Sequence, residues 1–228
     1  GEKGEKCVSM ERMSTLIYLD SDIIAVAKNA GEAVETRRRG QTTVVAEQRR
    51  LRDDDAIHPV HRIDQPVAGL VLLGRNPAAI AAMHDQFRRG EVERTYIAVV
   101  TAPADPPAGV LEDTISDGNG NERSVLHPGG KPTRLRYHTI GSTTHHTILA
   151  VTLDTGRRHQ IRVQLAARGW YVLGDARYGA RRPMRDKSIG LFAYRLTFRH
   201  PRMGTTIALR APFPAGSLWS DVAETVRN

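Results

Sequence analysis

The sequence predicts a mixed α+β fold. Short apolar or alternating runs, which are typical of strands, are more frequent than segments with helical spacing. The strand-like runs follow one another in groups and isolated helical segments interrupt them, whereas a βαβ array would alternate the two regularly. At 228 residues, the chain is long enough to bury a substantial core without a disulfide or a metal.

The first part of the chain predicts a leader and then a hairpin. Residues 1–14 are polar and without an apolar period, so we expect a flexible leader, followed by one domain over 15–228. Two short β-like runs at 16–19 and 23–27 flank acidic turn residues and predict a hairpin. The next expected elements are a loop at 29–40, a weak helix at 42–51 and a buried strand that ends at Gly74.

The strongest local helix signal is at residues 76–90. Asn76 can cap the helix, Pro77 suits its first turn, apolar residues follow at helical spacing, and Gly90 suits the position after its end. Residues 92–100 alternate and then become wholly apolar, as a strand entering a core does.

The rest of the chain returns to strands. Three prolines at 101–109 exclude a sheet strand there, and the DGNG sequence at 117–120 predicts a turn, so 110–128 is expected to form a hairpin-like excursion. The other expected elements are strands at 133–139 and 147–154, a turn and short helix at 155–169, a Gly- and Arg-rich loop at 170–183, strands at 191–198 and 205–209, and a terminal helix at 218–226.

The composition narrows the function classes. A formal net charge of +8 favours an acidic or phosphate-rich partner, with nucleic acid first. The single cysteine, Cys7, excludes an intramolecular disulfide and a CxxC metal site, which fits a reducing cytoplasm. No apolar run reaches the length of a membrane span, so we expect a soluble, cytoplasmic protein. Basic residues are concentrated at 37–39, 49–52, 88–94, 157–162 and 181–185.

The stretch HPVHRIDQPVAGLVLLG at 58–74 is the most informative part of the chain. It places Asp64 beside Arg62, where a loop enters a buried strand, a position suited to holding an ionised group against a ligand. The alternative is that Asp64 caps a helix or forms a surface ion pair with Arg62. A metal trio of His58, His61 and Asp64, with His159 as a fourth ligand, is less favoured because no further acid lies nearby in the sequence.

Several ordered motifs accompany this stretch. They are HRID at 61–64, RTYIAV at 94–99 and GRRHQIR at 156–162, followed by GD at 174–175 and YG at 178–179. With these motifs, and with KPTRLRY at 131–137 and LFAYRLTFRHP at 191–201, the chain resembles the RluA-type pseudouridine synthases from about residue 16 to about residue 214.

The resemblance implies isomerisation of uridine to pseudouridine within RNA, without cofactor or metal. It implies a mostly antiparallel sheet with peripheral helices and a central basic cleft. Asp64 matches the essential aspartate, a nucleophile or base at the ribose, and Arg162 matches the basic residue that holds it. Tyr96 matches the tyrosine that packs on the uracil and is a candidate for removing the C5 proton, and Arg62 matches the arginine that helps expose the base.

The expected partner is structured RNA, ribosomal or transfer, bound by a monomer without a separate S4-type domain. Val67-Ala68 replaces the usual Thr-Ser, Asn29 stands where proline is common, and Trp170-Tyr171 replaces a common His-Pro. These departures concern substrate fit and not the residues assigned to catalysis. Two other function classes are a non-catalytic RNA-binding or RNA-folding protein and a metal-dependent phosphoesterase that uses the histidines. The predicted RNA contacts are His61, Arg62, Arg94, Arg157, Arg158, His159, Gln160 and Arg177.

Overall fold

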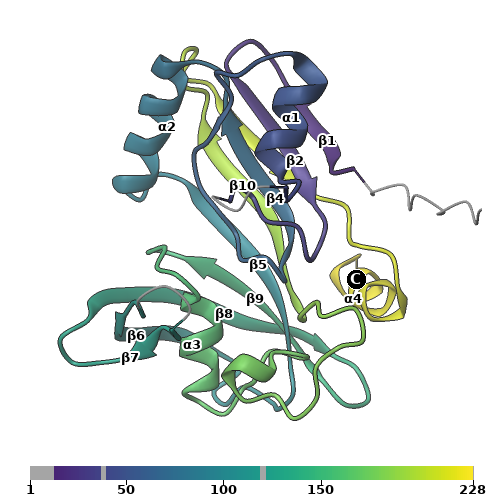
Figure 1. Ribbon diagram of the computed structural model, residues 1–228. Coiled ribbons are helices and arrows are strands. Elements are labelled where there is room, and N and C mark those ends of the chain that lie inside the picture. The colour runs from purple at the N-terminus through teal and green to yellow at the C-terminus, as the bar shows by residue number, and fades with distance from the viewer. Residues whose placement is uncertain (1–12, 37–39, 119–121, 228) are drawn as a thin grey trace, which may run out of the picture.

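The computed structural model describes residues 13–36, 40–118 and 122–227. Their strands form one sheet in the order β1-β2-β4-β10-β5-β9-β8-β6-β7, with β11 paired to β10 and β3 paired to β4 (Figure 1). Among the described strands, β4 and β10 form the only parallel pair, which confirms a mixed and mostly antiparallel α+β fold. The strands are β1 (Thr15–Leu19), β2 (Ile23–Lys28), β3 (His58–Pro59), β4 (Ala68–Gly74), β5 (Glu93–Val100), β6 (Ala108–Ser116), β7 (Val125–Leu126), β8 (Lys131–Ser142), β9 (Thr147–Leu153), β10 (Leu191–Arg199) and β11 (Thr206–Arg210).

The helices lie at the periphery, as expected. The predicted helix at 76–90 is α2 (Pro77–Arg88): the Asn76 side chain accepts a hydrogen bond from the Ala79 N–H, and Gly90 follows with φ +71°. The weak candidate at 42–51 is also a helix, and its cap is Thr43. The other helices are α1 (Val44–Arg52), α3 (Gln160–Ala166), α4 (Ser217–Arg227) and the 3₁₀ turn η1 (Ala176–Tyr178).

Each face of the sheet has its own apolar core. Along β4, Val71 and Leu73 belong to the cluster that α1 and α3 cover, whereas Leu70 and Leu72 belong to the cluster of α2 and α4. This alternation is the period of two that a strand imposes on its side chains. None of the helices in the described residues is long and apolar enough to cross a membrane.

Gly69 brings β4 close to β10. Its φ is +123°, and a Cβ atom there would lie 2.2 Å from the carbonyl oxygen of Ala193. Only glycine fits this approach, since any side chain would collide with backbone. The predicted loop that precedes β4, with Asp64, is thereby placed beside the centre of the sheet.

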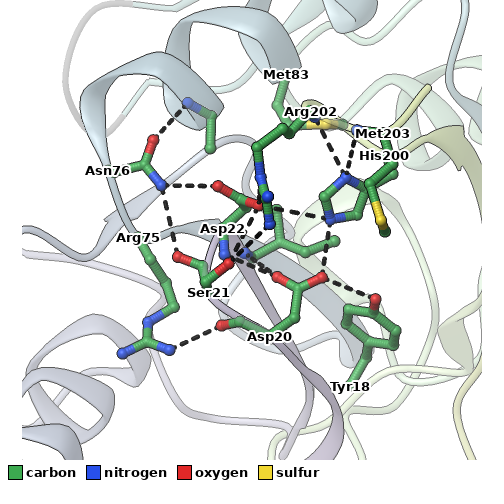
Figure 2. A network of polar contacts seen from close by, with 12 residues as sticks. Tyr18, Asp20, Ser21, Asp22, Arg75, Asn76, Met83, His200, Arg202 and Met203 are labelled. Atoms are coloured by element: carbon green, nitrogen blue, oxygen red, sulfur yellow. Dashed lines mark hydrogen bonds and ion pairs between the residues drawn. The ribbon is translucent and has the colours of Figure 1, made fainter.

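A set of polar residues joins three turns at one end of the sheet, and we call it the turn cluster: Asp20, Asp22, His200 and Arg202 (Figure 2). The Asp20 carboxylate lies 2.8 Å from Nε2 of His200, and Asp22 accepts a 2.8 Å hydrogen bond from Nε of Arg202. Asp22 also accepts a hydrogen bond from Asn76, at the start of α2. The β1–β2 turn, the β10–β11 turn and the first turn of α2 are thus held together.

The described residues leave some expectations outside the structure. Residues 1–12 of the expected leader at 1–14, which include Cys7, are not among the described residues. The same holds for the basic run at 37–39 and for residues 119–120 of the predicted turn at 117–120.

Candidate active site

The predicted catalytic carboxylate meets an arginine that is 98 residues away in the sequence. Asp64 lies in the loop before β4, and its Oδ2 accepts a 2.9 Å hydrogen bond from Nη1 of Arg162 in α3. The same guanidinium is held from behind by Asp175, at 2.7 Å from Nε and 2.9 Å from Nη2. We call Asp64, His159, Arg162 and Asp175 the Asp64 cluster.

Arg162 is a buried cation fixed by two carboxylates. Its side chain is 4% exposed, which rules out a solvated helix face. Burial lowers the pKa of an arginine, but Asp175 and then Asp64 outweigh burial and raise the pKa of Arg162, so the guanidinium stays charged. The Tyr178 ring lies against it, with 4.9 Å from Cζ to the ring centroid. Asp64 therefore faces a rigid positive charge.

Tyr96 of β5 lines the same small cavity as Asp64 and Arg162. This cavity has a volume of about 80 Å³. Burial raises the pKa of Tyr96 to about 12, so the phenol is protonated at neutral pH. The ring can pack against a ligand in the cavity.

A larger groove of about 820 Å³ continues from this cavity, and Asp64 and Arg94 line both. Arg94 extends from β5 with its Cζ 5.6 Å from the Phe87 ring centroid. No ion pair of Arg94 occurs within the described residues, and its Nε is buried without a hydrogen-bond partner there. The arginine and histidine side chains along the groove are those of His61, Arg62, His84, Arg88, Arg94, Arg157, Arg158 and His159.

Lys28 anchors the loop that carries Asp64. Its side chain is 2% exposed, and its ammonium group donates to the backbone carbonyls of Asn29, Glu32 and Gln65. Because Gln65 follows Asp64 directly, the ammonium holds the chain next to Asp64. Burial lowers the pKa of Lys28 to about 8.

Two predicted RNA contacts have mainly structural surroundings. Gln160 is 2% exposed, and its amide oxygen accepts from the Thr155 hydroxyl and from the Arg157 N–H, which closes the turn before α3. It also lines the cavity of Asp64, so its RNA contact stays a prediction. His61 uses Nε2 to accept from the Leu72 N–H and stacks on Phe87, although it also lines the groove.

The predicted arginines differ in their partners. Arg62 is exposed and pairs with Glu35, so the alternative of an Asp64–Arg62 pair is not what the structure contains. Arg158 and Arg177 both donate to the carbonyl of Glu122, which fixes them beside the β6–β7 excursion. Of these three, Arg62 and Arg158 line the groove, and Arg177 lies near His159.

The alternative metal trio of the sequence is not assembled. His58 contacts the Ala56 carbonyl and Arg49. Among the described residues, the group of acids and histidines close enough to share a metal ion is instead Asp20, Asp22 and His200, in the turn cluster. Its nitrogen and oxygen atoms already bond to protein groups (Figure 2).

Sequence reasoning missed two members of the site. Asp175 and Tyr178 stand in the GDARYG motif, inside the segment expected to be a Gly- and Arg-rich loop. Asp175 is 2% exposed and pairs with Arg162, and Tyr178 contacts both Arg162 and His159. The available signal was that GD at 174–175 and YG at 178–179 are among the motifs that carry the family resemblance.

These features define a class of protein: an α+β domain with a buried arginine–carboxylate pair at the floor of a basic groove. The family described as RNA pseudouridylate synthase matches residues 22–167, and the chain belongs to that family. An uncharacterized RNA pseudouridine synthase of Chloroflexus aurantiacus is 34% identical over 68% of this chain and 50% of its own length. Ribosomal large subunit pseudouridine synthase D of Neisseria meningitidis is 31% identical over 87% of this chain and 58% of its own length.

The chain thus spans about half the length of the first of these relatives. Among solved structures, the human RNA pseudouridylate synthase domain containing 4 has a TM-score of 0.74 at 19% identity, covering 93% of each chain. The human RNA pseudouridylate synthase domain containing 1 has a TM-score of 0.74 at 18% identity, covering 98% of each chain. These likenesses confirm the expected fold.

Proposed function

We propose that the protein isomerises uridine to pseudouridine in RNA and that Asp64 is its essential carboxylate. The observation that carries the proposal is the Asp64–Arg162–Asp175 chain of contacts at the floor of a cavity that also contains Tyr96. A carboxylate that accepts a hydrogen bond from a buried guanidinium is held in one orientation, as a nucleophile or base must be. The basic groove in front of it suits an RNA backbone.

The reaction is redox-neutral. The bond from ribose C1′ to uracil N1 breaks, C5 bonds to C1′, C5 loses its hydrogen, and N1 gains a proton. Asp64 acts at the ribose, either as a nucleophile at C1′ or as a base. The uracil must stay in the site while it turns, and the Tyr96 ring supplies a surface for it.

The target uridine must first leave its stack in the RNA. Arg62 suits this step because it is exposed and lines the cavity, and within the described part of the chain its ion-pair partner is the exposed Glu35. Replacing that pair with RNA costs little, since exposed ion pairs contribute at most about 1 kcal/mol. The names of two relatives, ribosomal large subunit pseudouridine synthases D and C, favour ribosomal over transfer RNA as the first substrate to test.

The test is tritium release from RNA labelled at uracil C5 and taken from cells that lack the protein. Wild-type protein is expected to release tritium to water, and Asp64→Ala is not. Chemical mapping of pseudouridine in the treated RNA locates the site. If wild-type protein binds the RNA but releases no tritium from ribosomal or transfer RNA, the proposal fails and a non-catalytic RNA-binding role replaces it.

A further inference from the structure

His159 lies between Asp64 and a tyrosine that the proposed reaction does not use. It precedes α3 with φ +56°, a left-handed conformation that asparagine and histidine tolerate better than most residues. Its Nδ1 is 2.7 Å from the Tyr178 hydroxyl. Its Nε2 is 3.8 Å from Oδ2 of Asp64, which is beyond hydrogen-bond distance.

The hydrogen-bond donors around Tyr178 decide where the imidazole carries its proton. The Tyr178 oxygen already accepts from the Ser124 N–H at 3.1 Å. The single hydroxyl proton then has the His159 ring nitrogen as its acceptor. Burial raises the pKa of Tyr178, so it stays a phenol, and burial lowers the pKa of His159 to about 4, so the ring is neutral near pH 7.

The charged groups around the ring agree with a neutral imidazole. Beside burial, the negative charge of Asp64 raises the pKa of His159. The positive charges of Arg162, Arg158 and Arg177 lower it. Asp64 is already bonded to Arg162, so part of its charge is compensated. A neutral imidazole that accepts at Nδ1 carries its hydrogen on Nε2.

We propose that Tyr178 fixes His159 as the Nε2–H tautomer and that this N–H donates to the uracil C2 carbonyl oxygen of the nucleotide bound beside Asp64. The proposal rests on the proposed function. His159 and Asp64 line the same cavity, so a nucleotide bound beside Asp64 is within reach of the His159 ring. When the bond from C1′ to N1 breaks, its electron pair passes to the uracil and spreads onto that carbonyl, so a fixed donor stabilises the separated state. His159 is then a catalytic residue, and Tyr178 is a positioning residue.

The tautomer can be measured without any reaction. Long-range ¹H–¹⁵N correlation spectra of uniformly ¹⁵N-labelled protein separate the two neutral tautomers and the imidazolium, and the signals missing from His159→Gln assign the ring. We expect the Nε2–H tautomer of His159 in the wild type at pH 7. We expect a mixture of the two neutral tautomers in Tyr178→Phe, which keeps an aromatic ring against Arg162 but removes the hydroxyl. An Nδ1–H ring or an imidazolium in the wild type would overturn the proposal.

The donor role is tested by two amides that place their N–H groups differently. The glutamine amide of His159→Gln reaches the position of Nε2, whereas the asparagine amide of His159→Asn lies near Nδ1. The left-handed backbone favours asparagine, so a purely structural role predicts that asparagine is the better replacement. We expect the opposite in single-turnover tritium release: a loss of about 10²-fold for asparagine, as for His159→Ala, and a clearly smaller loss for glutamine.

Two controls separate the possible failures. Replacing the target uridine with 2-thiouridine weakens the acceptor, so the difference between wild type and His159→Ala should shrink with this RNA; an undiminished difference refutes donation to the C2 carbonyl. Asparagine equal to or better than glutamine also refutes the donor role. Absence of tritium release by the wild type refutes the proposed function and the donation together, while the NMR result decides the tautomer independently.

Discussion

Two regions of this molecule contain the same residue types, two aspartates, a histidine and an arginine, but differ in how completely these groups are partnered. In the turn cluster, the histidine is fully used: Nδ1 of His200 accepts from the Arg202 and Met203 N–H groups, and Nε2 donates to Asp20 (Figure 2). Asp20 also accepts from Tyr18 and from two backbone N–H groups. Such a network stabilises the fold and offers nothing to a ligand.

The Asp64 cluster is complete only on its inner side. Asp175 and Arg162 are satisfied and buried, whereas within the described residues Asp64 receives one hydrogen bond, to Oδ2, and lines a cavity. His159 points its second nitrogen at Asp64 from a distance too long for a bond. The comparison teaches that residue composition does not separate a candidate catalytic cluster from a structural one; unused hydrogen-bonding capacity beside a cavity does.

The largest expected effect distinguishes Asp64 of the Asp64 cluster from Asp20 of the turn cluster. Asp64→Asn should reduce single-turnover tritium release by about 10³-fold or more, because an amide is neither a nucleophile nor a base. Its unfolding free energy should change by less than about 1 kcal/mol, since Arg162 keeps Asp175. The matched variant, Asp20→Asn, should keep its turnover and lose stability. Equal turnover of the two variants would remove the distinction drawn here.

The next effect concerns the inner half of the Asp64 cluster. Asp175→Asn should lower the unfolding free energy by about 3 kcal/mol, measured by urea denaturation, because it leaves a buried guanidinium with too little negative charge. Turnover of the folded fraction should also fall, since Arg162 loses the contact that orients it toward Asp64.

The control for this prediction is Asp113→Asn, which breaks the pair of Asp113 with Arg168 at 2.5 Å. This pair also joins an aspartate to a helix-side arginine, but both partners are more exposed, so the expected loss is below about 1 kcal/mol. Similar losses in the two variants would show that burial does not govern these pairs.

A third prediction tests the turn cluster through pH. Burial acts to raise the pKa of Asp20, but hydrogen bonds from the Ile23 and Asp22 N–H groups, Tyr18 and His200 lower it from 3.8 to about 2. Between pH 4 and 2 the unfolded chain therefore binds more protons than the folded one, so stability falls as the pH falls through this window. Asp20→Asn should lose about 2 kcal/mol at neutral pH and should show a flatter decline below pH 4. Guanidinium midpoints measured from pH 7 to pH 2 provide the check; an equally steep decline in the variant contradicts it.

Local sequence signals were sufficient to predict the main helices and strands, but they were insufficient to predict the contacts among Asp64, Arg162 and Asp175. The helix after Asn76 has its cap, proline and glycine within a short segment, so its prediction was confirmed. The contact of Asp64 with Arg162 joins segments 98 residues apart, and only the family resemblance suggested it. Asp175 was missed because its partner is brought to it by tertiary folding, and the burial of Gln160 in the turn before α3 could not be read from its polar motif.

The smallest expected effect compares two arginines, one from each region. Arg94 lines the groove, and its Nε is buried without a hydrogen-bond partner among the described residues, whereas Arg202 is already paired with Asp22. An unpaired guanidinium gains most from a phosphate, because it gives up no carboxylate to bind one. Arg94→Gln should weaken RNA binding roughly tenfold and reduce the slope of log affinity against log salt by about one, as expected for the loss of one phosphate contact.

Arg202→Gln lowers the net charge of the protein by the same amount as Arg94→Gln, but it removes the charge from the turn cluster and not from the groove. It should leave the salt slope unchanged, so the pair of variants separates a local phosphate contact from the general effect of net charge. Filter binding of one labelled RNA at several salt concentrations measures both slopes. Equal decreases in the two variants would mean that overall charge, not the groove, binds the RNA. A decrease for Arg94→Gln alone places the RNA backbone beside the cavity of Asp64.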